Sequence, residues 1–320
     1  MAAPSLVTRS VNKGKYVIQH KVLLGVEPVW RYVLNAGPTR DHRKRSNGLS
    51  PEAARVLRDL NRDGCAQSSL EALTGDPTLL GRLQEEAKAL EAARADEVAA
   101  KAKALQEIHD LGDGNTKPYL VQYLDANRPV VDPRGLLAAT ALEANIKAVA
   151  DAYYGMRTRV ADLNVWRNLP SNHAPVASQL WHRDQPDDHL VLKMFVYLED
   201  VIEGAGPLSY VKGTHGKGDR KWKPHGTVHD GHNMRAHDDD MDREVPEPRR
   251  PRFTGPAGTV ILADTIGWHK GGQATTTPRL LIQVLYASRG ATDYRMLGAP
   301  AGLDLSSVTP DLAFDKNTLS

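Results

Sequence analysis

Two histidines and one aspartate in the second half of the chain have residue types and spacing suited to a metal site. His182 and Asp184 end a strand-like segment, and residues two apart on an extended chain point to the same side. His269 follows a later strand-like segment and lies among glycines that permit close backbone approach. Two imidazoles and one carboxylate that leave other coordination positions open are typical of iron(II) oxygenases. These three residues are the predicted catalytic metal ligands.

A second segment, His237–Asp238–Asp239, also combines an imidazole with carboxylates. It lies in a polar run, residues 236–244, that has no alternation of apolar and polar residues and therefore predicts no strand. We interpret it as a solvated loop. Taken alone, His182 would more often be an ordinary polar residue at the end of a strand, so its assignment depends on the residues that accompany it.

An arginine begins the strand-like segment that follows His269. Alternation over residues 279–287 places Arg279 and Gln283 on one face, and a continuous apolar row on the other. The apolar row is expected to pack under helices, so Arg279 and Gln283 should point into a barrel. A guanidinium buried there is costly unless an anion meets it, and a dicarboxylate can do so through paired hydrogen bonds. The alternative is a structural ion pair with a protein carboxylate.

Six short strand-like segments, separated by Gly, Pro and Asp, must position these residues. They are expected at 159–167, 178–182, 190–198, 208–211, 259–263 and 279–287. Strands at this spacing predict a sandwich or barrel, with the earlier helices covering one face. The segment 213–252 interrupts them with charged residues, Gly, His and Pro, and predicts a long loop over the barrel mouth.

The first half of the chain predicts helices. Ser50 followed by Pro51 has the features of a helix start and leads into residues 53–61. A long helix with a narrow apolar stripe is expected over 79–111, ended by Gly112–Asp113–Gly114, and a second helical stretch over 133–154. A strand is expected at Tyr16–His20. We divide the chain into an N-terminal arm (1–49), a main domain (50–290, helical to 157 and β from 158) and a C-terminal tail (291–320).

Composition narrows the function classes. The chain has 320 residues, 41% of them hydrophobic, and no apolar run near the ~20 residues of a membrane span. It has no pattern of a secretory signal, so a cytoplasmic location without a membrane partner is expected. The single cysteine, Cys65, excludes an intrachain disulfide and a zinc-thiolate site. A net charge of +2 predicts no nucleic-acid partner.

Together, these residues resemble the phytanoyl-CoA dioxygenase family of iron(II)- and 2-oxoglutarate-dependent oxygenases. The segment Gln179–Asp184 is similar to the family's Q-x-W-H-x-D, and residues 195–201, 258–272 and 278–281 also follow the family. Residues 205–208 and 212–215 are similar to its N-G-P-L and P-G-S-H elements, with departures at Ala205, Lys212 and Thr214. The resemblance covers roughly residues 57–290 and is strong from 158 onward.

The resemblance implies a mainly β fold with flanking helices, a double-stranded β-helix of the jelly-roll or cupin-like kind, covered by helices on one face. It implies that His182, Asp184 and His269 bind Fe(II) and that Arg279 binds the distal carboxylate of 2-oxoglutarate. Gly271 stands where some relatives carry a hydroxyl that helps to hold this cosubstrate. From strand alternation, further cosubstrate contacts are expected from Asn164, Lys193, Phe195 and Gln283, and substrate contacts from Trp166 and Tyr197. Arg167 and Gln179 are further candidate substrate contacts.

The expected reaction is hydroxylation of an unactivated C–H bond in a small-molecule substrate, with O2 consumed and succinate and CO2 released. Asp184 favours hydroxylation because related halogenases carry a small residue in place of the carboxylate, while desaturation and epimerisation stay open. Lys193 and Arg167, near the predicted mouth, favour an anionic substrate. The alternatives are a non-redox β-helix protein that binds a metal or ligand and, with little support from three Phe and mild charge, a nucleic-acid demethylase. No pattern names the substrate or the oligomeric state.

Overall fold

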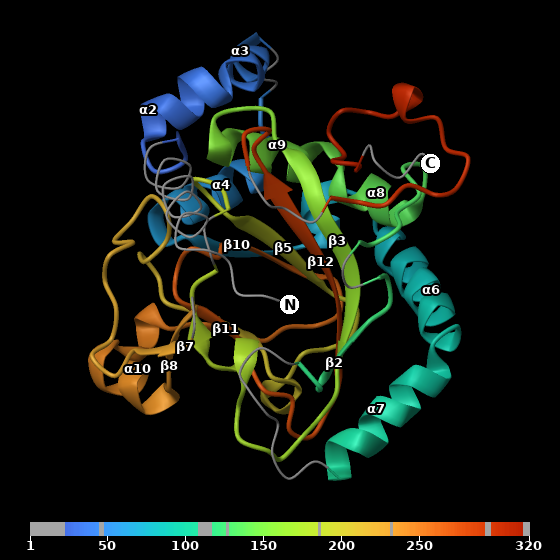
Figure 1. Ribbon diagram of the computed structural model, residues 1–320, viewed down its shortest axis with the longest axis vertical. Helices are drawn as coiled ribbons and strands as arrows, with labels where there is room; N and C mark the ends of the chain where they lie inside the picture. The colour runs from blue at the N-terminus through green and yellow to red at the C-terminus, as the bar shows by residue number, and fades with distance from the viewer. Residues whose placement is uncertain are drawn as a thin grey trace, which may run out of the picture.

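The computed structural model describes residues 23–44, 48–107, 117–125, 128–184, 187–230, 233–291 and 296–315. Two antiparallel sheets of six strands each build the centre of the molecule (Figure 1). The first, here the major sheet, has the order β1 (Cys65–Ser69), β10 (Thr259–Asp264), β5 (Leu192–Tyr197), β12 (Arg279–Ala287), β3 (Arg159–Asn168), β2 (Leu120–Gln122). The second, the minor sheet, has the order β7 (Val228–Asp230), β8 (Asn233–Ala236), β4 (Trp181–His182), β11 (His269–Gly271), β6 (Leu208–Tyr210), β9 (Arg252–Phe253).

The path of the chain between the two sheets defines the fold. From β3 to β6 successive strands alternate between the major and the minor sheet, and from β9 to β12 they alternate again. Each strand of the second set lies beside a strand of the first, as β12 lies between β3 and β5. This is the double-stranded β-helix, so the predicted fold class is confirmed.

Alternation along β12 separates two environments, as predicted. Leu280, Ile282, Val284 and Tyr286 belong to the core between the major sheet and the helices, while Leu281 belongs to the cluster inside the barrel. The helical side of that core comes from α4 (Pro51–Asp63), α5 (Leu70–Thr74), α6 (Leu79–Ala92), α8 (Leu136–Ala141) and α9 (Ala144–Tyr154). The predicted helical cover over one face of the barrel is therefore present.

Helix boundaries follow local capping. Ser50 Oγ accepts a hydrogen bond from the backbone N–H of Ala53 at 3.2 Å, as expected for the start of α4. The single long helix predicted over 79–111 is wrong, because the chain turns at Ala93 and Arg94 between α6 and α7 (Ala95–Glu107). The stretch 133–154 is likewise two helices, since the Glu143 carboxylate caps α9. The predicted end of the long helix, at residues 112–114, and the strand predicted at 16–20 lie outside the described residues.

The first described residues form α2 (Glu27–Val29), η2 (Trp30–Leu34) and α3 (Ala36–Lys44) at one end of the molecule (Figure 1). Trp30 is fully buried, and its indole N–H donates to Asp188 Oδ1 at 2.6 Å. Asp188 also accepts a hydrogen bond from the backbone N–H of Ser288, just after β12. The arm is thus joined to the end of the major sheet through one buried carboxylate.

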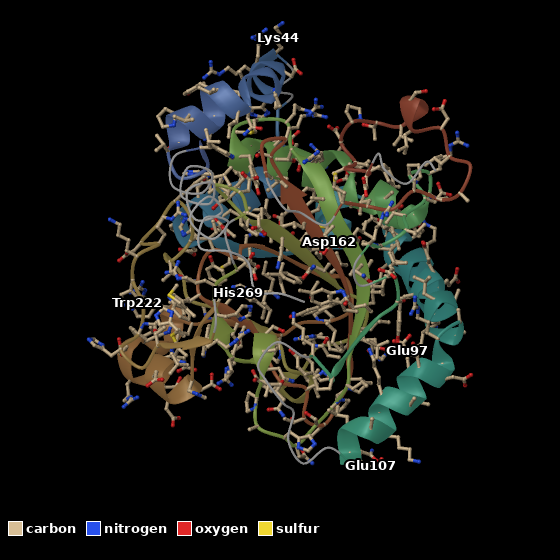
Figure 2. The ribbon with its side chains drawn as sticks, viewed as in Figure 1. Lys44, Glu97, Glu107, Asp162, Trp222 and His269 are labelled. Atoms are coloured by element: carbon tan, nitrogen blue, oxygen red, sulfur yellow. The ribbon has the colours of Figure 1, made fainter. Side chains whose placement is uncertain are left out.

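The prediction of an unstructured loop over the mouth for residues 213–252 is wrong. This segment contains β7, β8 and α10 (Asp238–Glu244), and its apolar side chains pack on the outer face of the minor sheet. There Met241 and Val245 join Trp181 and Trp268, the residues that alternate with the two predicted histidine ligands. Trp222 of the same cluster lies at the periphery near α10, whereas His269 lies toward the middle of the molecule (Figure 2).

The remaining regular elements are short 3-10 turns: η3 (Ala177–Gln179), η4 (Glu203–Ala205), η5 (Glu247–Arg249) and η6 (Leu305–Ser307). The first of them replaces half of the strand predicted at 178–182, because Ala177 adopts a positive φ of 51° and Gln179 Oε1 accepts from Val176 N–H. Among the described residues, no helix has both the length and the apolar character to cross a bilayer.

Candidate metal centre

His182, Asp184 and His269 come together at the inner side of the minor sheet. Each offers one ligand atom, and these atoms all lie within 4.8 Å of one another. The two histidines are direct cross-strand partners on β4 and β11, with ring centroids 4.3 Å apart. Asp184 follows β4, where its backbone N–H donates to Thr265 O at 2.9 Å. Within the described residues, no other group of three or more His, Cys, Asp or Glu residues has this geometry.

Backbone carbonyls fix the orientation of both imidazoles. Nδ1 of His182 lies 2.9 Å from Leu180 O, and Nδ1 of His269 lies 2.9 Å from Gly267 O. An Nδ1–H that donates to a carbonyl leaves the Nε2 lone pair for a metal, a common arrangement for histidine ligands. Both Nε2 atoms face Asp184, at 3.9 Å from its Oδ1 and Oδ2 respectively.

The protonation states of the three residues suit a divalent cation. Burial lowers the pKa of His182 and of His269, which keeps both imidazoles neutral. Burial alone would raise the pKa of Asp184, but the ammonium of Lys193, the largest opposing influence, helps to hold that pKa well below its usual range. Two neutral imidazoles and a carboxylate of this kind fit iron(II).

The competing segment at His237–Asp238 is occupied by other contacts. Asp238 Oδ1 accepts a hydrogen bond from the indole N–H of Trp181 at 2.7 Å and another from Lys270. It therefore tethers the start of α10 to the outer face of the minor sheet, opposite to the side that holds the histidine pair. The segment is structured rather than the solvated loop that we predict.

Arg279 lies in the same cavity as the three residues, at the start of β12. Its side chain is buried, and within the described part of the chain Nε and Nη1 have no hydrogen-bond partner. Burial lowers the pKa of Arg279, an effect that nearby Tyr197 opposes. A buried guanidinium with free donors is costly, so an anion in the cavity would be strongly stabilised there. The alternative ion pair with a protein carboxylate is not found among the described residues.

Five further predicted contact residues also line this cavity: Trp166, Lys193, Phe195, Tyr197 and Gln283. They come from three neighbouring strands of the major sheet, and their cross-strand register places them on one face. Lys193 is the one that meets a metal ligand, since its Nζ lies 2.5 Å from Asp184 Oδ2. Their contacts to cosubstrate and substrate stay predictions.

The structure gives three predicted residues other partners. Arg167 alternates with Trp166 onto the helix-covered face, where it forms ion pairs with Glu91 and Glu199, so its predicted place near the mouth is wrong. Asn164 Oδ1 accepts from the backbone N–H of Leu124 at 3.1 Å. The Gln179 side chain bonds within its own turn. None of the three lines the cavity.

Several cavity residues were not predicted from the sequence. They are Lys117, Tyr119, Leu120, Asn168, Ser178, Leu208 and Leu281. Asn168 and Leu281 follow from the alternation that identifies Trp166 and Arg279, so a stricter use of that rule would find them. Lys117 to Leu120 carry no comparable signal, because they enter the site through the pairing of β2 with β3, which is distant in sequence.

The chain is similar to one known family and to several solved structures. The profile of the phytanoyl-CoA dioxygenase (PhyH) family matches residues 74–280. No curated protein matches the chain. Among solved structures, AviO1 from Streptomyces viridochromogenes Tue57 is 18% identical, over 77% of this chain and 100% of that chain, with a TM-score of 0.49.

Two other solved structures are similar at the same level. HygX from Streptomyces hygroscopicus, with nickel and 2-oxoglutarate bound, is 15% identical over 84% of this chain and 98% of its own, with a TM-score of 0.48. EctD from S. alaskensis, with 2-oxoglutarate and 5-hydroxyectoine, is 20% identical over 83% of this chain and 85% of its own, also at 0.48.

Proposed function

We propose, since the chain belongs to the phytanoyl-CoA dioxygenase family, that it is an iron(II)- and 2-oxoglutarate-dependent oxygenase that hydroxylates an unactivated C–H bond of a small molecule. In this reaction O2 is consumed, and succinate and CO2 are released. One observation carries the proposal: two neutral imidazoles, a carboxylate and a buried guanidinium with free donors all face one cavity.

The residues of the cavity fit both cofactors. His182, Asp184 and His269 would hold iron(II), and Arg279 would hold the distal carboxylate of 2-oxoglutarate. When bound, these groups supply the oxidising chemistry, which the protein itself lacks. The chain's contribution is to orient them and to exclude water, through apolar walls that include Phe195 and the buried Tyr197.

The charge of the cavity favours an anionic substrate. Three cationic side chains, Lys117, Lys193 and Arg279, line it together with one carboxylate, Asp184. Iron(II) and the 2-oxoglutarate dianion cancel one another, so the occupied site keeps an excess of positive charge. A positive cleft with low-dielectric walls concentrates anions. This excess does not require Arg167, which faces away from the cavity.

Anaerobic reconstitution with iron(II) and 2-oxoglutarate tests the proposal. We expect a weak visible charge-transfer band in the wild type, and its absence in Asp184→Ala that has kept its fold by circular dichroism. A panel of small carboxylates and phosphates in air should contain a compound that stimulates succinate formation and gains one oxygen atom. A folded wild type without the band would contradict the oxygenase. The band without stimulated succinate formation by any compound would favour the non-redox binding protein.

A further inference from the structure

Arg183 stands between two of the metal ligands in the sequence, and its side chain points away from them. It is buried, at 7% exposure, whereas His182 and Asp184 are half-buried. Its guanidinium donates to four backbone carbonyls: Thr214 O at 3.0 Å, Ile266 O at 2.7 Å, Asp219 O at 3.4 Å and Trp222 O at 2.8 Å. Among the residues that the structure describes, no carboxylate lies within ion-pair distance of it. A single side chain thus binds two separate segments of backbone, residues 214–222 and the turn at Ile266.

One of those segments carries the third ligand. Ile266 immediately precedes Gly267, whose carbonyl oxygen is the hydrogen-bond partner of His269 Nδ1. Arg183 therefore connects the backbone of His182 and Asp184 to the turn that orients His269. The guanidinium also lies over the indole ring of Trp268, 5.5 Å from its centroid, which adds a cation–π contact next to the same ligand.

The other carbonyls belong to residues 214–222, the first part of the segment that packs outside the minor sheet. Trp268 is tied to this part twice, since its backbone N–H donates to Thr214 Oγ1 at 2.9 Å and its indole N–H to Trp222 O at 3.0 Å. Arg183, from the His182–Asp184 segment, and Trp268, next to His269, therefore both bind residues 214–222. This stretch connects the two ligand-bearing segments on the side away from the metal site.

Main-chain pairing between the two ligand-bearing segments is short, although each strand also pairs with a neighbour on its other side. Strand β4 has two residues and β11 has three, and the two strands are registered by one pair, His182 with His269. Beyond this pair, a main-chain hydrogen bond from Asp184 N–H to Thr265 O joins the two segments, so side-chain contacts must supply the rest of their registration. A planar guanidinium with five donors in a fixed geometry can bridge several carbonyls at once, which an ammonium at a single point cannot.

We propose that Arg183 is a positioning residue of the metal centre: it holds the His182–Asp184 segment and the Gly267–His269 segment in register, so that the ligands are preformed before the metal binds. The identity of the metal as iron(II) rests on the proposed function, but the binding of a divalent cation to this site does not. Loss of Arg183 leaves four carbonyls without this donor, two of them in buried hydrogen bonds, and weakens the contacts that hold the two segments in register.

Titration of the metal-free protein with Co(II), followed by its visible absorption, tests this role without turnover. We expect Arg183→Met to weaken Co(II) binding by roughly 10- to 100-fold, the usual effect of losing a residue that orients ligands, and to alter the shape of the Co(II) spectrum. Arg183→Lys keeps the charge and part of the hydrogen bonding, so its affinity for Co(II) should lie between those of the wild type and Arg183→Met. It also keeps the test possible if the Met variant does not fold.

Arg167→Met is the matched control. Arg167 is buried to the same degree, at 8% exposure, but its partners Glu91 and Glu199 lie on the helix-covered face. We expect this variant to melt at a lower temperature and to bind Co(II) like the wild type. Wild-type Co(II) affinity in Arg183→Lys, or equal weakening in Arg167→Met, would overturn the proposal. Failure of the wild type to oxidise 2-oxoglutarate would instead contradict the proposed function alone.

Discussion

Lys193 Nζ lies 2.5 Å from Asp184 Oδ2, so a cation on the major sheet reaches across the barrel to a ligand carried by the minor sheet. The other carboxylate oxygen, Oδ1, faces His182 Nε2 at 3.9 Å. Oδ2 also faces His269 Nε2 at 3.9 Å. Lys193 therefore competes for Oδ2 and makes no contact of this kind with Oδ1. The residue that we predict as a cosubstrate contact is also the charge partner of a ligand.

Replacement of Lys193 by Met should weaken metal binding. Without the ammonium, the largest influence that opposes burial is gone, so the pKa of Asp184 rises and the carboxylate loses its counter-charge. We expect a Mn(II) dissociation constant at pH 7 at least several-fold above that of the wild type, with Lys193→Arg closer to normal. Unchanged metal affinity with weakened 2-oxoglutarate binding would instead make Lys193 a cosubstrate contact only.

Replacement of Arg279 by Met should affect the cosubstrate and spare the metal. Two of its donors, Nε and Nη1, are buried and have no partner among the described residues, so a ligand anion can meet them. Charge-assisted hydrogen bonds contribute about 1.5–3 kcal/mol, so we expect 2-oxoglutarate to bind roughly 10- to 100-fold more weakly. Titration of the charge-transfer band gives that constant, and Mn(II) affinity measured alongside should not change. A parallel loss of Mn(II) binding would indicate a structural role.

Addition of a hydroxyl at Gly271 should strengthen 2-oxoglutarate binding. A Cβ there would meet Arg279 Nη2 at 3.5 Å and Ser178 O at 3.8 Å, which are ordinary contacts, so a serine fits without displacement. Its hydroxyl could reach a carboxylate held by Arg279, and one net hydrogen bond is worth about 0.5–1.5 kcal/mol. We expect Gly271→Ser to lower the dissociation constant by a few-fold, with Gly271→Ala as the control. Equal effects of Ser and Ala would exclude the hydroxyl as the cause.

Strand alternation predicted the parts of the site where one strand separates two environments. On β12 the bounds are as expected and Arg279 points into the cavity, because apolar packing under the helices determines the other face. Alternation also places Arg167 on the face of β3 opposite to that of Trp166, which is the helix-covered face. Its predicted position near the mouth did not take this alternation into account. Asn164 could not be judged this way, since its partner is the backbone of Leu124, which only the folded sheet brings near.

Residues 213–252 show where composition misleads. Their apolar side chains are few and follow no period, which is why the sequence indicates a solvent-covered loop. Trp222, Met234 and Met241 nevertheless pack with Trp181 and Trp268, because the minor sheet has an apolar outer face that local sequence does not reveal. In the described residues no cavity wall comes from this segment, and Lys117 to Leu120 provide one instead.

Stability should depend on pH through Asp188, the carboxylate that joins the arm to the end of β12. Burial raises the pKa of Asp188 to about 6, although donors that include Ser288 and Trp30 favour its charged form. An unfolded aspartate has a pKa of about 3.9, so the folded chain binds this proton more tightly. The stabilisation is complete below about pH 4 and is lost as the pH rises to about 6. Asp188→Asn lacks this titration. The difference in unfolding free energy between wild type and Asp188→Asn, from urea denaturation, should therefore fall between pH 4 and 6 and level off above 7. A difference that grows over that range would mean that the hydrogen bonds to the carboxylate outweigh its burial.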